Sequence, residues 1–253
     1  MSILQLCRVW NSLFAAGVCA YAYIIAGHAV YIEATAAIFF LLSFANAHND
    51  IVDFNVDKIN RPDRPLPSGK ISLKTAKIAA AVCLFLAIAF GFKFAWLFAI
   101  VGALCFVYNK YLKRFPLVGN FAVALLVTTP IAIPILDIGL PQLELFNLMF
   151  FAFTLTLARE ITKDIEDIEG DRAMGLRTLP ILINAQFSLI LVFLCEIQCL
   201  VQLAMFKLPV FFAVLPCLLL SAFFACKKKI KLSQNMIKIA MVLGLVFFYI
   251  YHT

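Results

Sequence analysis

The chain has 253 residues, of which 64% are hydrophobic and only 14% charged, with a formal net charge of +7. Soluble domains have about 45–50% apolar and about 25% charged residues. The composition therefore excludes a soluble globular domain and indicates a protein whose surface faces lipid.

Apolar runs of membrane-spanning length follow one another along the whole chain, and such a span needs about 20 mostly apolar residues. Pro130 and Pro134 predict a kink in the fifth run, because proline removes a helical hydrogen bond. The sequence predicts an all-α polytopic membrane protein, a bundle of about nine transmembrane helices folded as a single domain over residues 1–253. The runs are residues 6–27, 31–49, 72–91, 94–110, 117–136, 143–162, 179–206, 209–226 and 236–251.

The basic residues are distributed unevenly between the two sides of this predicted bundle. When the connections are assigned to alternate sides, 19 of the 21 Lys and Arg residues fall on one side, and only Lys93 and Lys207 fall on the other. Connections rich in Lys and Arg stay cytoplasmic. The N-terminus is therefore expected in the cytoplasm and, with an odd number of spans, the C-terminus outside.

Two polar clusters with identical spacing close the second and the sixth runs. Each member of the second cluster lies 114 residues after its counterpart. Because a helix turns by about 100° per residue, positions spaced by 4, 3 and 4 residues share one face. The equal spacing indicates an internal duplication of a helical hairpin. The first cluster contains Asn46, Asn49, Asp50, Asp53 and Asp57, and the second contains Glu160, Lys163, Asp164, Asp167 and Asp171.

Carboxylates at a helix C-terminus oppose the helix macrodipole and repel one another at i, i+4 spacing. Two facing stripes of this kind form an oxygen-only site, which suits Mg²⁺ shared with a substrate phosphate. Arg61 and Arg64 follow the first cluster in a Pro-rich loop, and Lys163 belongs to the second. The clusters predict a Mg²⁺–diphosphate site at the cytoplasmic face, with a lipid tail in the apolar bundle. The alternative is a merely solvated acidic surface.

The two clusters resemble the motifs of the UbiA-type intramembrane prenyltransferase family. The first family motif, N-x-x-x-D-x-x-x-D, matches Asn49, Asp53 and Asp57, and the second, D-x-x-D-x-x-x-D, matches Asp164, Asp167 and Asp171. The resemblance covers essentially the whole chain. It implies a nine-helix bundle that catalyses Mg²⁺-dependent prenyl transfer.

Within the family, four segments are most similar to the archaeal digeranylgeranylglyceryl phosphate synthases. Chlorophyll synthases share parts of two of them, so residues 159–164 discriminate best. The implied reaction transfers a geranylgeranyl group from geranylgeranyl diphosphate to geranylgeranylglyceryl phosphate, a step of archaeal ether-lipid synthesis. An aromatic or chlorophyllide-like acceptor is the alternative. The segments are residues 8–11, 61–69, 159–164 and 169–180.

The resemblance also implies roles for individual residues. Asp53, Asp57, Asp167 and Asp171 would be the catalytic carboxylates that hold Mg²⁺, with Asn49 and Asp164 as further ligands. The expected partners are a polyprenyl diphosphate, a lipid phosphate and the bilayer, and no nucleic acid. The expected substrate-binding residues are Arg8, Asn11, Asn49, Arg61, Arg64, Tyr108, Lys110, Lys113 and Lys163.

Two other classes of membrane protein compete with this interpretation. A transporter also has internal repeats, but it normally carries ionisable residues near the midplane. The predicted spans are almost free of charge except at their cytoplasmic ends. A purely structural membrane protein leaves both acidic clusters unexplained.

Overall fold

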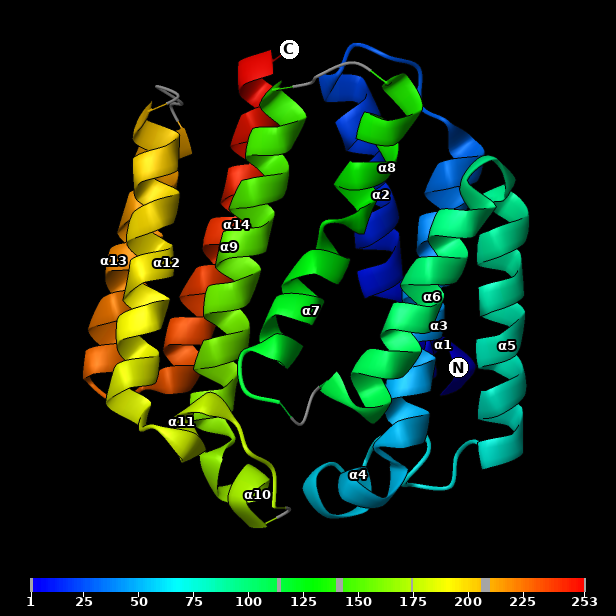
Figure 1. The fold of residues 1–253 in the computed structure, drawn as a ribbon, viewed down its shortest axis with the longest axis horizontal. Helices are drawn as coiled ribbons and strands as arrows, with labels where there is room; N and C mark the ends of the chain where they lie inside the picture. The colour runs from blue at the N-terminus through cyan, green and yellow to red at the C-terminus, as the bar shows by residue number, and fades with distance from the viewer. Residues whose placement is uncertain (1, 113–114, 140–142, 174, 206–209, 253) are drawn as a thin grey trace. The chain divides into compact units, whose positions relative to one another are not determined.

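The structure is a computed structural model that describes residues 2–112, 115–139, 143–173, 175–205 and 210–252. Within these residues the regular elements are all helices, which confirms the all-α class (Figure 1). Each predicted apolar run overlaps one main helix or, in the fifth run, a broken pair. The helices are α1 (Ser2–Leu6), α2 (Val9–Ile25), α3 (Ile32–Val52), α4 (Phe54–Asn60), α5 (Leu73–Phe90), α6 (Ala95–Lys110), α7 (Val118–Val127), α8 (Thr129–Ile138), α9 (Leu143–Glu166), α10 (Ile168–Ala173), α11 (Leu179–Leu182), α12 (Ala185–Met205), α13 (Val210–Cys226) and α14 (Ile230–His252), with a 3₁₀ turn at Phe92–Phe94.

Several of these helices are long and apolar enough to cross a membrane. In the described residues four segments qualify, or five if α7 and α8 form one broken span. The helices α2 and α13 are apolar but shorter. A multi-pass membrane protein is thus confirmed, while the number of nine spans stays a prediction. The four segments are Leu73–Phe90, Phe92–Lys110, Leu143–Glu166 and Ala185–Met205.

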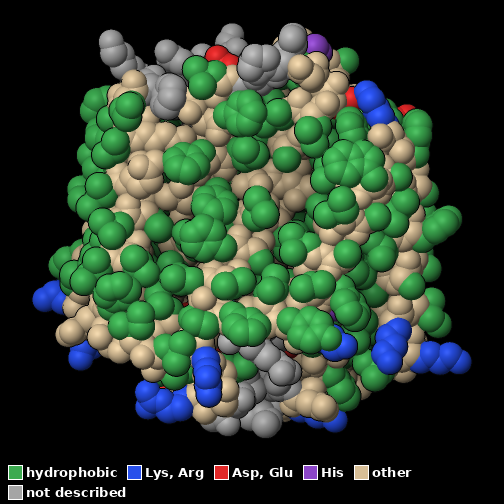
Figure 2. Space-filling model, viewed as in Figure 1, with side chains coloured by type: hydrophobic (Ala, Val, Ile, Leu, Met, Phe, Trp, Pro, Cys, Tyr) green, Lys and Arg blue, Asp and Glu red, His purple; other side chains and the backbone are tan. Residues whose placement is uncertain are grey.

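The outer surface of the helices is apolar. Trp10 is 82% exposed and Phe212 is 78% exposed, and many other large hydrophobic side chains are also exposed. Figure 2 shows hydrophobic side chains spread over the viewed face, with Lys and Arg at its edges. Contiguous apolar surface on this scale marks an interaction site in a soluble protein, whereas a bilayer accepts it without cost.

The chain divides into two compact units, each arranged around one long helix. The first unit comprises residues 1–112 and 129–139, and the second comprises residues 113–128 and 140–253. In the first unit, α3 packs against α2, α5, α6 and α8. In the second, α9 packs against α7, α12 and α14, and α13 packs against α14. The two central helices, α3 and α9, carry the acidic clusters. The single-domain organisation stays a prediction.

The fifth apolar run is broken where proline was expected to disturb it. Helix α7 ends at Val127 and α8 begins at Thr129. The Thr128 hydroxyl donates a hydrogen bond of 2.7 Å to the carbonyl of Leu125, which satisfies an acceptor of the last turn of α7. Pro130 has no N–H for a continuous helix, and it lies at the second position of α8, where the missing N–H costs no intrahelical hydrogen bond.

Charged side chains are not confined to the predicted cytoplasmic ends of the spans. Glu196 lies near the middle of α12 and is 3% exposed, so it is an exception to the expectation that the spans are almost free of charge away from their cytoplasmic ends. A single glutamate lowers the mean hydropathy of a long apolar run only slightly, so the run still reads as a membrane span. In the first unit, Asp137 accepts a hydrogen bond of 2.8 Å from the Tyr23 hydroxyl and forms an ion pair with Lys93.

Gly244 allows α14 to lie close to α9. A Cβ atom at this position would overlap the ring of Phe151, a side chain that is 2% exposed. Overpacking of this kind destabilises by about 1–3 kcal/mol. We therefore expect Gly244→Ala to lower the thermal unfolding midpoint of the detergent-solubilised protein.

Gly17 in α2 provides the matched control, because a Cβ there meets no atom within 4 Å. Gly17→Ala should leave the midpoint unchanged or raise it, since alanine is favoured over glycine in helices by about 0.5–1 kcal/mol. Equal midpoints for both variants would contradict the close packing of Gly244 on Phe151.

Candidate active site

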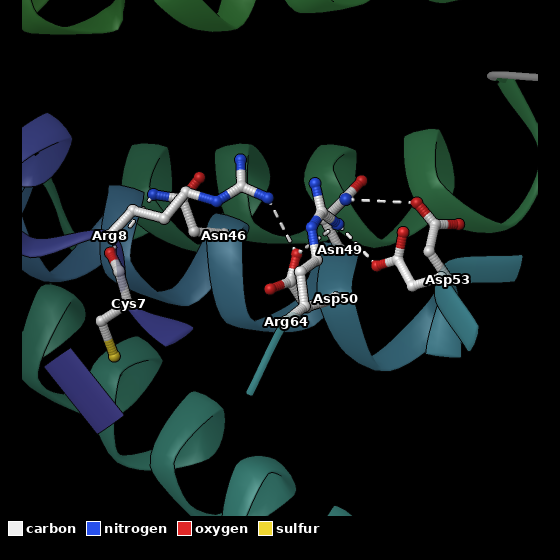
Figure 3. A network of polar contacts seen from close by, with 8 residues as sticks. Cys7, Arg8, Asn46, Asn49, Asp50, Asp53 and Arg64 are labelled. Atoms are coloured by element: carbon white, nitrogen blue, oxygen red, sulfur yellow. Dashed lines mark hydrogen bonds and ion pairs between the residues drawn. The ribbon is translucent and has the colours of Figure 1, made fainter. Parts of the chain in front are cut away.

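The first acidic motif lies where α3 breaks into α4. Helix α3 ends at Val52, and α4 begins at Phe54. The backbone continues across this break, because the N–H of Asp53 donates to the carbonyl of Asn49 (2.9 Å) and the N–H of Asp57 donates to the carbonyl of Asp53 (2.8 Å). The side-chain amide of Asn49 donates to Asp53 Oδ2 at 3.2 Å (Figure 3). The three motif residues therefore lie one turn apart along a broken helix end.

Two arginines reach this motif from elsewhere in the chain. Arg8 Nη2 donates to Asp50 Oδ1 at 2.8 Å, and Arg64 Nη1 donates to the same oxygen at 3.1 Å (Figure 3). Arg64 Nη1 also donates to Asp57 Oδ2 at 2.5 Å. The cationic compensation that the acidic stripe requires is thus supplied in part by arginine. Asp50 was in the predicted stripe but not among the predicted site residues.

The surroundings of Asp50 are unsuited to a divalent cation. A cation of charge +2 at about 4 Å from one guanidinium group is repelled by about 8 kcal/mol at an effective dielectric constant of 20, and Asp50 has two such neighbours. Asn49 and Asp53 lie on the adjoining turn and offer amide and carboxylate oxygens. Metal ligation in the first unit is therefore better matched to Asn49 and Asp53 than to Asp50. Asp57 also pairs with Arg64, and its role as a ligand stays a prediction.

Backbone conformation positions these arginines, Arg8 between α1 and α2 and Arg64 in the loop after α4. Arg8 lies between α1 and α2 in the left-handed region, with φ 46° and ψ 55°. That conformation costs a residue other than glycine about 1–2 kcal/mol and persists only where the surroundings enforce it. On the other side, Pro65 and Leu66 are buried, and the Ser68 hydroxyl donates to the Arg64 carbonyl at 2.7 Å. The folded loop therefore directs Arg64 toward α3 and α4.

The second acidic motif repeats the same break in the second unit. Helix α9 ends at Glu166 and α10 begins at Ile168, each 114 residues after its counterpart. The N–H of Asp167 donates to the carbonyl of Lys163 (3.0 Å), and the N–H of Asp171 donates to the carbonyl of Asp167 (2.9 Å). The duplication predicted from spacing is therefore present in the local backbone of both units.

The side chains around the second motif differ from those around the first. Asp164, the counterpart of Asp50, accepts a hydrogen bond of 2.9 Å from the side-chain amide of Asn120 in α7. Glu160 forms ion pairs with Arg159 at 2.7 Å and Lys163 at 3.7 Å. Asn120 was not among the predicted site residues, because it stands 44 residues before its partner and no local motif marks it.

The remaining predicted substrate-binding residues have more open positions. Arg61 and Asn11 are exposed, and Tyr108 is half-buried in the last turns of α6. Lys110 is exposed, and its ammonium lies 5.8 Å from the centre of the Phe106 ring. Lys113 lies outside the described residues. These side chains stay predictions as substrate ligands.

The donor chemistry of the two motifs fits Mg²⁺ that is shared with a ligand. Within the described ranges, no three Asp, Glu, His or Cys side chains cluster closely enough to hold a metal ion. Magnesium prefers oxygen donors and is usually held by one or two carboxylates together with water and substrate phosphates, rather than by a complete protein cage. The motif residues supply that partial set of oxygen donors.

The fold and these side chains define a class: multi-pass helical membrane proteins with an acidic motif at each of two repeated helix breaks. The family model described as the UbiA prenyltransferase family matches residues 9–251. The chain belongs to the UbiA prenyltransferase family.

Relatives of known name lie within the same family. A digeranylgeranylglyceryl phosphate synthase of Methanosphaera stadtmanae is 34% identical over 224 residues, covering 82% of this chain and 81% of the relative. The synthases of Methanobrevibacter smithii and Thermococcus kodakarensis are 39% and 45% identical over 171 and 166 residues. These two matches cover 63% and 59% of this chain, and they span only 60% and 57% of the relatives' own length.

Solved structures share the fold. One, reported as a study of digeranylgeranylglyceryl phosphate synthase in membranes, superposes with a TM-score of 0.79 and 24% identity over 99% of this chain and 97% of its own. A UbiA homologue from Archaeoglobus fulgidus bound to GPP and Mg²⁺ has a TM-score of 0.69 at 18% identity, and the match covers 99% of each chain.

Proposed function

We propose that this protein transfers a geranylgeranyl group from geranylgeranyl diphosphate to geranylgeranylglyceryl phosphate, giving digeranylgeranylglyceryl phosphate and pyrophosphate with Mg²⁺ as cofactor. The observation that carries the proposal is the pair of repeated helix breaks, each with the carboxylates of a family motif. The names of the relatives support this choice of donor and acceptor.

In this proposal the carboxylates at the two breaks hold the metal–diphosphate group. Asp53, Asp57, Asp167 and Asp171 are the ligands, with Asn49 and Asp164 as additional ones. Bound Mg²⁺ supplies neutralisation of the charge that develops on the departing diphosphate. Lys163, Arg61 and Lys113 donate charge-assisted hydrogen bonds to the phosphate oxygens. These residues orient the allylic C–O bond and stabilise its cleavage.

Bond formation follows at the same carbon atom of the prenyl chain. The allylic C–O bond to the diphosphate breaks, and the acceptor hydroxyl oxygen forms a new C–O bond. The hydroxyl proton passes to a site carboxylate or to the released pyrophosphate. The positive charge that develops on the allylic carbon is stabilised by aromatic faces and by exclusion of water. Tyr108 is our candidate for such a face.

The acceptor phosphate needs a second group of cationic side chains. We assign it to one or more of Arg8, Arg64 and Lys110. Arg8 and Arg64 both donate hydrogen bonds to Asp50 Oδ1. Two neighbouring guanidinium groups favour a phosphate-bearing acceptor over an aromatic or chlorophyllide-like one. The guanidinium group suits phosphate because its donors form a planar fork.

The decisive experiment incubates the purified protein with Mg²⁺, geranylgeranyl diphosphate and a panel of acceptors, and identifies the lipid product by mass spectrometry. We expect a doubly prenylated glycerol phosphate. Prenylation of 4-hydroxybenzoate or of a chlorophyllide instead would move the assignment to another acceptor class. Absence of prenyl transfer to any acceptor would favour a transporter.

The orientation of the chain belongs to the same proposal. We place the N-terminus and the site face in the cytoplasm and the C-terminus outside, because 19 of 21 basic residues fall on one predicted side. A reporter after Thr253 should be external, and one inserted in the Lys58–Lys70 loop should be cytoplasmic. If both reporters are found on the same side of the membrane, the prediction of nine spans is wrong.

A further inference from the structure

Asp50 is a buried carboxylate on which two arginines from distant segments converge. Its side chain is 4% exposed, whereas the side chain of Arg8 is 34% exposed and that of Arg64 is 19% exposed. Arg8 is 42 residues away along the chain and Arg64 is 14 residues away. The carboxylate is therefore enclosed, while both arginine side chains stay partly exposed.

The two guanidinium groups retain donors for such a ligand. Each has five N–H donors, and among the described contacts Arg8 uses Nη2 and Arg64 uses Nη1. Both arginines bind the same oxygen, Asp50 Oδ1, so the carboxylate holds the two groups side by side (Figure 3). Adjacent guanidinium forks match the oxygens of a phosphate monoester.

The protein backbone keeps this pair in place. The carbonyl of Cys7, next to Arg8, accepts hydrogen bonds from the Ser12 hydroxyl (3.1 Å) and the Asn46 amide (3.3 Å). The Ser43 hydroxyl extends the network to Ser12 at 3.1 Å. Helix α3 thus fixes the left-handed turn at Arg8 from one side through Asn46 and Asp50. A non-glycine residue in this strained conformation is typical of functional sites.

Among the contacts of the described residues, the second unit does not repeat this arrangement. Asp164 occupies the position equivalent to Asp50, but its described hydrogen-bond partner is the neutral amide of Asn120. The duplicated metal motif alone therefore does not account for two arginines at Asp50. Binding of an additional anion in the first unit accounts for them.

We propose that Asp50 is a positioning residue: it holds Arg8 and Arg64 as a pair that binds the phosphate monoester of the acceptor. This inference rests on the proposed function. It adds Asp50 to the site and separates the residues that bind the acceptor phosphate from those that hold the metal. Asp50 does not ligate the metal. It acts only through the two arginines.

The test compares Asp50→Asn with Asp137→Asn. The control removes the charge of another carboxylate in the same unit, which pairs with Tyr23 and Lys93. Tyr23 is 15 residues beyond Arg8 along α2, or about 22 Å at 1.5 Å per residue. Binding of geranylgeranylglyceryl phosphate and of geranylgeranyl diphosphate is measured separately by titration calorimetry. The acceptor titration contains EDTA, so its result does not depend on the metal or on turnover.

We expect Asp50→Asn to raise the Kd of the acceptor roughly 10- to 150-fold, the loss that corresponds to a charge-assisted hydrogen bond. The Kd of the diphosphate with Mg²⁺ should change by less than about twofold, as for independent sites. Asp137→Asn should change neither. In an Arg8→Ala/Arg64→Ala background, Asp50→Asn should not raise the acceptor Kd further, because the two arginines through which Asp50 acts are absent.

Other outcomes overturn the inference in distinguishable ways. If the wild-type protein binds the acceptor and Asp50→Asn binds it equally well, the positioning role fails and the proposed function stands. A larger loss for the Mg²⁺-bound diphosphate than for the acceptor would make Asp50 a metal ligand. A wild-type protein that does not bind the acceptor refutes both. If Asp50→Asn does not fold, Asp50→Glu decides, because it keeps the charge and displaces it by one methylene. Its acceptor Kd should rise several-fold, and an unchanged Kd refutes the inference.

Discussion

Replacement of Asp53 or Asp167 by alanine is expected to lower kcat at least about 100-fold while leaving the folded protein in the membrane. Loss of a residue that only supports a metal ligand typically costs about 10- to 100-fold in affinity or activity, and loss of a ligand itself should cost more. Asp53 and Asp167 stand at the two equivalent helix breaks. Steady-state kinetics with both substrates saturating measure the effect.

The double variant distinguishes one shared site from two separate ones. If both carboxylates hold the same metal–diphosphate group, removal of the second should cost far less than removal of the first. Asp63→Ala is the matched control, because Asp63 is an exposed aspartate in the loop after the first motif, and it should retain full activity. Activity near that of the wild type in either single variant, at moderate Mg²⁺, would refute the metal assignment.

The second large effect concerns the acceptor. At least one of Arg8→Ala, Arg64→Ala and Lys110→Ala should raise the KM for geranylgeranylglyceryl phosphate by roughly 10- to 150-fold, the equivalent of a lost charge-assisted hydrogen bond. The KM for geranylgeranyl diphosphate should change far less. Initial rates with each substrate varied in turn give both values.

Lys77→Ala controls for the general loss of positive charge, because Lys77 is an exposed residue of α5. It should leave both KM values unchanged. If all three site variants affect the two substrates equally, the acceptor assignment fails and the prenyl-transfer assignment remains. Arg64→Lys adds detail, since it keeps the charge but loses the planar fork of donors.

Local patterns in the sequence were sufficient for the class of fold and for the motifs. Long apolar runs can satisfy their backbone polar groups in lipid only as helices or closed barrels, and their helical length made the all-α prediction correct. Pro130 marked the break in the fifth run for an equally local reason. The equal spacing of the two acidic motifs predicted a duplicated hairpin, and the structure has the same backbone break at Asp53 and at Asp167.

Hydropathy was less informative about single charges and about the number of spans. A run of about 20 mostly apolar residues still reads as a span when it holds one carboxylate, and Glu196 in α12 is such a residue, almost fully buried. The criteria of length and composition select four or five described spans, and α2 and α13 are too short to meet them.

Only the tertiary structure decided which side chains neutralise which carboxylates. The sequence offered many basic residues near the predicted cytoplasmic face, and nothing local singled out Arg8 and Arg64 as partners of Asp50 or Asn120 as the partner of Asp164. These contacts join residues 42, 14 and 44 positions apart. Helical periodicity determines which residues share a face, but the side chain that meets that face depends on how the loops return and how neighbouring helices pack.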